Sequence, residues 1–185
     1  LGFEWVKKIN QQTGAVEKTT FIQNDPIFGA KLAGNVSKSE TFVNNVLVKK
    51  EERFYEVIDD IYPGTHFIRG RSGATTPASI TSVYENGSFH FKSEKFVTYD
   101  SGGPIQQAQV VWSKEKTGSE PEIIQTTVYD YFNAGQVTIP RPLEVQVKDG
   151  NNNILRQNQI VYNGTNISEK QVWLNLPTAK WISTF

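Results

Sequence analysis

Apolar and polar side chains alternate with a two-residue period along much of this 185-residue chain. The clearest runs are Leu143–Lys148, with the order Leu-Glu-Val-Gln-Val-Lys, and Val172–Leu176, with the order Val-Trp-Leu-Asn-Leu. A period of two places one face of a strand on a core and the other face in water, as in antiparallel sheets. We therefore expect an all-β protein, built as an antiparallel β-sandwich of an Ig-like or jelly-roll-like kind.

Turn residues divide the chain into β-prone runs that we expect to pair as hairpins. The Asn86-Gly87 dipeptide is the strongest of these turn signals, because both of its residues readily take the left-handed conformation of a tight hairpin. The predicted strands are Phe3–Ile9 with Ala15–Ile22, Thr41–Lys49, Ile80–Tyr84 with Ser88–Lys92, Ile105–Ser113 with Glu122–Phe132, Leu143–Lys148 with Ile154–Tyr162, and Gln171–Leu176.

One segment carries a helical pattern instead. Phe54, Val57, Ile58 and Ile61 occur at positions i, i+3, i+4 and i+7, which would place them on one face of a helix. We expect one short helix or, equally, a further strand over Lys50–Ile61.

The polar stretch Lys114–Pro121 is either a linker between domains or the loop of a hairpin. We favour the loop, because the β-prone runs on its two sides have similar lengths and the piece after it would be small for an independent domain. The expectation is a single domain over 1–185, and the alternative is two small β domains over 1–113 and 122–185.

Charge and composition exclude several classes of partner and site. Lys and Arg number 19, equal to Asp and Glu, so the chain lacks the basic surface that binds nucleic acid. It contains no apolar run long enough for a stable membrane span. It has no cysteine for disulfides, zinc-thiolate sites or thiol catalysis. The first residues lack the plan of a signal peptide, and there is no methionine, which fits a chain trimmed at its N-terminus.

Candidate catalytic and metal sites have simpler interpretations. Tyr99–Pro104 resembles the nucleophile segment of trypsin-like serine proteases, but His66 precedes Ser101 by 35 residues, too few for that family's two-barrel arrangement. His66 and His90 share no metal-ligand spacing. Asp149–Asn153 alternates oxygen-bearing side chains as a calcium loop does, but it lacks the closing Glu and is better explained as a hairpin turn. We predict no enzyme activity, no cofactor and no metal.

The acidic cluster that includes Glu51, Glu52 and Glu56, with Asp59 and Asp60, could in principle supply the two carboxylates of a glycosidase. Lys49, Lys50 and Arg53 interleave with it, which is typical of a solvated charged face.

Trp173 is the candidate binding residue. The alternation places Val172 and Leu174 on one face of their strand and leaves Trp173 on the other with Gln171 and Asn175. An indole ring stacks on the apolar side of a sugar while neighbouring amides bond its hydroxyls. The alternative is that a second sheet or a subunit interface covers Trp173. By the same alternation we expect Trp112, with Ala108 and Val110, and Trp5, with Phe3, to lie in the core.

We therefore expect a non-catalytic adhesion or binding module, secreted or at the cell surface, with a carbohydrate or protein ligand and a possible homo-oligomeric state. One alternative is a pore-forming, toxin-like β protein in which Ile105–Phe132 is the membrane hairpin. The other is a structural subunit of a fibre, coat or capsid, with Trp173 and edge strands as assembly surfaces.

Overall fold

The computed structural model describes residues 3–59, 66–99, 105–114, 121–134, 137–164, 166–174 and 179–184. Most of these residues lie in antiparallel strands, and the helical part among them is one 3-10 turn, η1 (Ala30–Leu32). The expected all-β antiparallel class is confirmed, and the finer expectation of a sandwich stays a prediction. None of the described helices is long and apolar enough to cross a membrane.

The chain divides into two compact units, Leu1–Glu94 and Lys95–Phe185, and the division falls inside β8 (Ser88–Tyr99). The single domain predicted for 1–185 and its two-domain alternative both stay predictions.

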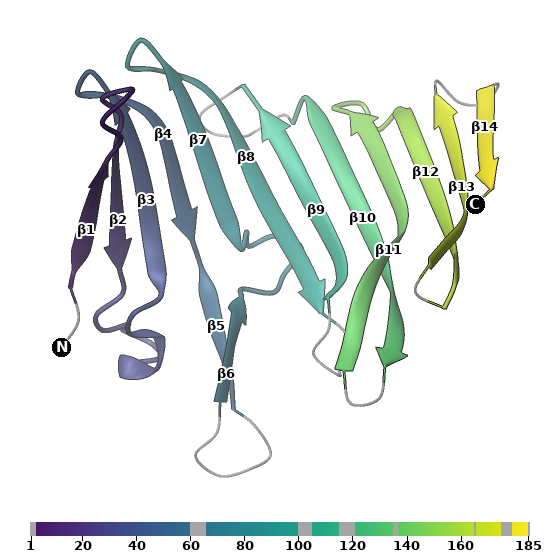
Figure 1. Ribbon diagram of the computed structural model, residues 1–185, viewed down its shortest axis with the longest axis horizontal. Coiled ribbons are helices and arrows are strands. Elements are labelled where there is room, and N and C mark those ends of the chain that lie inside the picture. The colour runs from purple at the N-terminus through teal and green to yellow at the C-terminus, as the bar shows by residue number, and fades with distance from the viewer. Residues whose placement is uncertain are drawn as a thin grey trace. The chain divides into compact units, whose positions relative to one another are not determined.

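In the first unit, the main sheet follows the order β1-β2-β3-β4-β7-β8 (Figure 1). Its strands before β8 are β1 (Trp5–Ile9), β2 (Val16–Phe21), β3 (Val36–Val43), β4 (Val46–Arg53) and β7 (Ser79–Glu85). Between β4 and β7, the strands β5 (Tyr55–Asp59) and β6 (His66–Gly70) pair only with each other, as a separate hairpin.

The helix considered for Lys50–Ile61 is wrong, because the described part of this segment is the end of β4 and all of β5. Phe54 stands between the two strands. Its N–H donates to the carbonyl oxygen of Ala78 at 2.9 Å, and its own carbonyl accepts from the N–H of Arg71 at 3.0 Å. The chain changes partner at Phe54, from β7 to β6, and this pairing with distant strands overrides the local helical pattern.

The single strand predicted over Thr41–Lys49 is also wrong, because a two-residue turn divides it. Asn44 and Asn45 have φ angles of 50° and 62°, and Val43 pairs directly with Val46. Asparagine is one of the few residues besides glycine that adopts this left-handed conformation at low cost. The Asn-Asn pair therefore closes a hairpin between β3 and β4.

The hairpins predicted at the start of the chain and at Asn86-Gly87 are confirmed by β1 with β2 and by β7 followed by β8. Trp5 and Phe3, however, are not core residues, since they are 49% and 80% exposed. The physical reason is that alternation shows which side chains share a face of a strand, but not whether anything covers that face. Leu143 and Val161, on strands in the interior of a sheet, are likewise 44% and 49% exposed.

In the second unit, the strands lie in chain order, β9-β10-β11-β12-β13-β14 (Figure 1). Their bounds are β9 (Ile105–Ser113), β10 (Ile123–Ala134), β11 (Val137–Asp149), β12 (Ile154–Asn163), β13 (Asn166–Leu174) and β14 (Ala179–Thr184). β9 pairs with β10 from Trp112 opposite Ile123 to Gln107 opposite Val128. The polar stretch between them therefore connects two paired strands, as predicted.

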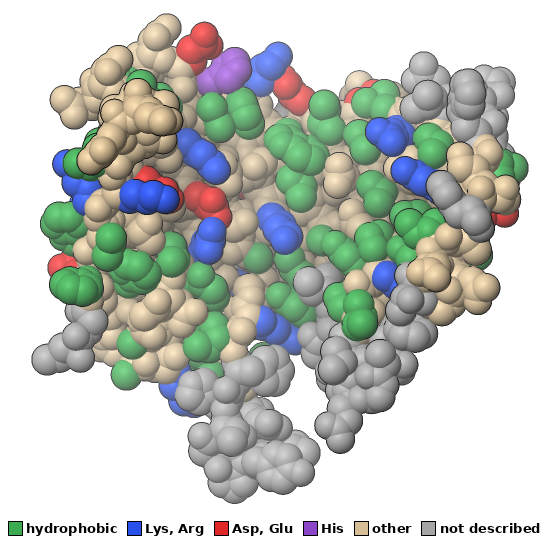
Figure 2. Space-filling model, viewed as in Figure 1, with side chains coloured by type: hydrophobic (Ala, Val, Ile, Leu, Met, Phe, Trp, Pro, Cys, Tyr) green, Lys and Arg blue, Asp and Glu red, His purple; other side chains and the backbone are tan. Residues whose placement is uncertain are grey.

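Few hydrophobic side chains of the described residues are buried. In the first unit these are Leu32 and Ala78, and in the second unit Val97 and Ala108. Many large apolar side chains stay at the surface, and hydrophobic side chains are spread over the face seen in Figure 2. Lys and Arg side chains lie beside Asp and Glu on that face instead of forming one patch of a single sign (Figure 2).

Candidate functional site

The strand register of the second unit aligns a row of polar side chains across five strands. Gln109 on β9 lies opposite Thr126 on β10, which lies opposite Gln146 on β11. Gln146 lies opposite Gln157 on β12, and Gln157 lies opposite Trp173 on β13. Directly opposed residues of antiparallel strands project to the same face of a sheet. These five residues therefore form one continuous row from Gln109 to Trp173, and the register continues from Trp173 to Lys180 on β14.

A second row of the same face lies two residues along each strand. It passes from Gln107 to Val128, Glu144, Gln159 and Gln171. We call the polar side chains of the two rows, together with Trp173, the amide face. Its members are Gln107, Gln109, Thr126, Glu144, Gln146, Gln157, Gln159, Gln171 and Trp173.

The opposite face of the same strands is more apolar. A row there contains Ala108, Thr127, Val145, Asn158 and Val172, in the same strand order. Ala108 and Thr127 are buried, at 7% and 9% exposed. The two-residue alternation seen in the sequence therefore separates a partly apolar face from the amide face, as it predicts.

Trp112, expected in the core beside Ala108 and Val110, is on this apolar face and is partly buried.

Hydrogen bonds between neighbouring side chains hold the amides in place. The Nε2 of Gln109 donates to Oγ1 of Thr126 at 3.3 Å. Oε1 of Glu144 accepts from Nε2 of Gln157 and, at 3.5 Å, from Nε2 of Gln146. Each amide nitrogen carries two N–H donors and each amide oxygen two lone pairs, so these amides can still bond a ligand. The face is thus partly ordered before anything binds to it.

Trp173 lies on this face, on the same side of its strand as Gln171, as the alternation predicts. The side chain is partly buried, lies level with Gln157, and shares its face with Gln171 on the same strand. Gln171 donates in turn from Nε2 to Oε1 of Glu169, on the same strand and face. Asn175, the third predicted site residue, lies outside the described residues.

Sequence reasoning missed Gln109, Gln146 and Gln157, which belong to other strands than Trp173. A signal was present, because Gln107 with Gln109 and Gln157 with Gln159 each stand two residues apart and so share a face of a strand. Joining them to Trp173 needs the register of four strand pairs, which periodicity alone does not supply.

A second polar cluster in this unit is built around Arg141 on β11. Its Nη2 is 2.8 Å from Oδ2 of Asp130, and its guanidinium carbon is 4.5 Å from the ring centroid of Tyr162. The hydrogen bond from Arg141 holds the pKa of Asp130 below its usual range, and burial raises the pKa of Tyr162. Tyr162 donates its hydroxyl to the carbonyl of Pro142 at 2.8 Å. These contacts tie β10, β11 and β12 together.

Asp149–Asn153 forms the turn between β11 and β12, as predicted. Oδ1 of Asp149 accepts from the N–H of Asn151 at 2.9 Å and of Asn153 at 2.8 Å, and Oδ2 accepts from the side chain of Asn153. The Asn153 side chain, more than any other contact, lowers the pKa of the Asp149 carboxyl. This carboxylate therefore stabilises the turn.

The other candidates from the sequence are ion-paired or lie outside the described residues. Glu51 is 2.8 Å from Arg53, Glu52 is 2.9 Å from Lys50, and Glu56 is 2.6 Å from Arg69. The hydrogen bond that Arg53 donates to Glu51 also raises the pKa of Arg53.

The protease-like segment after Tyr99 (residues 100–104), Asp60 and the side chains of Asp59 and His66 lie outside the described residues. His90 is 3.9 Å from Glu85. Within the described ranges, no three His, Cys, Asp or Glu side chains are grouped to hold a metal ion.

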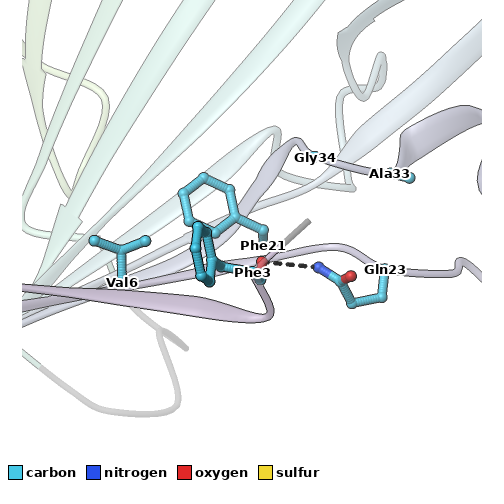
Figure 3. Close-up of a pocket in the computed structure, with 6 residues that line it drawn as sticks. All are labelled: Phe3, Val6, Phe21, Gln23, Ala33 and Gly34. Atoms are coloured by element: carbon cyan, nitrogen blue, oxygen red, sulfur yellow. Dashed lines mark hydrogen bonds between the residues drawn. The ribbon is translucent and has the colours of Figure 1, made fainter. Parts of the chain in front are cut away.

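A concave site of about 400 Å³ lies among the described residues of the first unit. It is lined by the apolar side chains of Phe3, Val6 and Phe21 and by Gln23, whose Nε2 donates to the carbonyl of Phe3 at 3.1 Å (Figure 3). A larger site, of about 590 Å³, lies between β4 and β5, where the guanidinium of Arg71 is 5.6 Å from the Phe54 ring centroid.

The larger site also includes Lys38 and Arg53, which pair with Glu40 at 3.1 Å and with Glu51 at 2.8 Å, and the acidic residues Glu4, Asp25 and Glu52. Charges of both signs line it, so that neither sign of ligand is favoured.

Comparison with known proteins finds no matching family model, no similar curated protein and no similar solved structure.

Proposed function

We propose that this protein is a non-catalytic binding module whose second unit takes carbohydrate on the amide face. The observation that carries the proposal is the register that sets Trp173 level with Gln157 and on the same face as Gln171. An indole offers a flat apolar surface to the C–H groups of a pyranose, and the amides on its own strand and on β12 offer donors and acceptors to the hydroxyls of the sugar.

The charges around the amide face favour a neutral sugar, because they are of both signs. Glu144 lies within the face and Glu169 lies beside Gln171, whereas Lys148 lies two residues along β11 from Gln146 and Lys180 is paired with Trp173. A sugar of either charge would therefore meet a group of its own sign here. We accordingly propose neutral glycans as the ligand and an adhesion role at a cell surface or outside the cell, where such glycans are displayed.

A glycan array probed with wild-type protein and with Trp173→Ala tests the proposal. We expect the wild type to bind neutral glycans and Trp173→Ala to lose about tenfold or more of that affinity, because stacking on an aromatic ring contributes on the order of 1 kcal/mol or more. Circular dichroism and size-exclusion light scattering on the same samples establish that the variant is folded.

Gln125→Ala is the matched control, since Gln125 lies opposite Val110, on the other face of the sheet from Trp173. The proposal fails if no glycan binds, or if a folded Trp173→Ala binds as well as the wild type.

A further inference from the structure

The amide face extends far beyond the reach of Trp173. The row from Gln109 to Trp173 crosses five strands, from β9 to β13. Neighbouring strands in a sheet lie about 4.8 Å apart, so four steps make the row roughly 19 Å long. One sugar ring stacked on Trp173 covers only its last step.

We infer that the ligand of this face is a linear neutral oligosaccharide that lies across the strands, with one ring on Trp173 and the following rings along the row towards Gln109. This inference rests on the proposed function and names the class of glycan that the same site takes. A single terminal sugar would leave three of the five side chains in the row without a ligand contact.

The chemistry of the row is suited to a repeating polymer. Amide and hydroxyl groups recur at every step before Trp173, as Gln109, Thr126, Gln146 and Gln157, and the second row adds Gln159 and Gln171 beside them. A linear glycan presents hydroxyl groups at the same regular intervals on each of its rings. Repeated groups on the protein therefore meet repeated groups on the ligand.

Hydrogen bonds within the face prepare it for a long ligand. Gln109 is held by Thr126 and Gln157 by Glu144, so both amides are ordered in the protein alone. Side chains that are already ordered lose less entropy when a ligand binds. Each further sugar ring can then add affinity instead of being offset by the cost of ordering.

The test is titration calorimetry of the full chain with neutral oligosaccharides of two to six sugars, taken from the cello-, malto- and chito-oligosaccharide series. In the series that binds, we expect affinity to rise about tenfold from the disaccharide to the hexasaccharide. Gln109→Ala should weaken hexasaccharide binding about fivefold, the effect of a lost hydrogen bond, and leave disaccharide binding unchanged.

Gln109→Leu, which keeps most of the side-chain volume, is the second variant in case the alanine variant is unstable. Gln125→Ala, on the opposite face, should change neither affinity.

The outcomes separate this inference from the proposed function. Two results would contradict a linear ligand while leaving sugar binding at Trp173 intact. One is an affinity that does not change with the length of the oligosaccharide. The other is an unchanged hexasaccharide affinity in both Gln109 variants, provided that they are folded. Loss of disaccharide binding on replacing Gln109 also overturns the linear ligand, because a short ligand would then reach the far end. Absence of binding by any glycan defeats the proposed function itself.

Discussion

Gly150 illustrates how one residue restricts a turn. A Cβ atom added at Gly150 would stand 2.2 Å from the carbonyl oxygen of Pro121, a backbone atom with little room to move. We expect Gly150→Ala to lower the free energy of unfolding by about 1–3 kcal/mol, the range for overpacking a filled site. Urea denaturation measures the change.

Gly164→Ala is the comparison, because Gly164 has a φ of 60° with nothing within 4 Å of an added Cβ. We expect Gly164→Ala to lower the free energy of unfolding by about 1 kcal/mol, from backbone strain alone. A Gly150→Ala protein as stable as the wild type would show that the turn and Pro121 can separate freely.

Asp130 should make stability depend on pH. Its pKa is lowered in the fold by the hydrogen bond from Arg141, whereas an unfolded aspartate titrates near 3.9. The folded chain thus binds this proton less readily, so Asp130 contributes stability above about pH 4 and loses it as pH falls through the folded pKa. The Asp130 side chain is 44% exposed, which limits the contribution to about 0.2–1 kcal/mol.

Thermal unfolding of the wild type and Asp130→Asn between about pH 6 and pH 2 measures this effect. The difference in Tm between the wild type and Asp130→Asn should decrease steadily as the pH falls. A difference in Tm that stays constant over that range would mean that the ion pair does not stabilise the fold.

At the scale of elements, the turn between β3 and β4 offers a sharp comparison. Asn45 has a φ of 62° at the second position of the turn, where Asn-Gly is the preferred pair. Asn45→Gly should raise the free energy of unfolding by about 0.5 kcal/mol, and Asn45→Ala should lower it by about 1 kcal/mol. The two variants of Asn45 should change the free energy of unfolding in opposite directions. Equal changes from both would contradict the left-handed turn geometry.

The sequence predicts the strands well where the turn residues between them are unambiguous. It predicts them less well where pairing with distant strands determines the backbone conformation. Asn86-Gly87 marks its hairpin because glycine adopts the positive φ found there without strain. In the Asp149–Asn153 turn the left-handed residue is Asn152, with a φ of 66°. Asn44-Asn45 carries a weaker form of the same signal, so the sequence predicts one continuous strand over Thr41–Lys49. The helical spacing around Phe54 misled for another reason, because partners distant in sequence determine the structure there.

The candidate site shows the same limit. Local alternation is enough to place Trp173 with Gln171 on a polar face, since it depends on one strand alone. Gln109 joins them only through the registers of four strand pairs, three of which contain an irregularity, after Val128, Val147 and Val161. A change of one residue in any of these registers would turn the far part of the row to the opposite face.

At the scale of the molecule, we expect the open edge of the sheet at β1 to control self-association. β1 is an edge strand, and its apolar residues Trp5, Val6 and Ile9 are 44–57% exposed. Lys7 and Lys8 lie among them, and lysine on an edge strand opposes pairing with another chain. We expect the double variant Lys7→Thr with Lys8→Thr to associate at lower concentration than the wild type, measured by light scattering.

A control double variant, Lys49→Thr with Lys95→Thr, removes the same charge from interior strands β4 and β8. This control should begin to associate at the same concentration as the wild type. If both double variants associate equally, the effect comes from the change in net charge and not from the edge strand β1.

Strand order that follows chain order has a consequence for how the second unit forms. From β9 to β14 each strand meets the one that precedes it along the chain, so every pairing closes a short stretch of polypeptide. Short closures cost little entropy and favour rapid folding, in contrast to sheets that wait for distant segments. A chain that emerges gradually, from a ribosome or through a membrane pore, could add each strand to the growing sheet as soon as it appears.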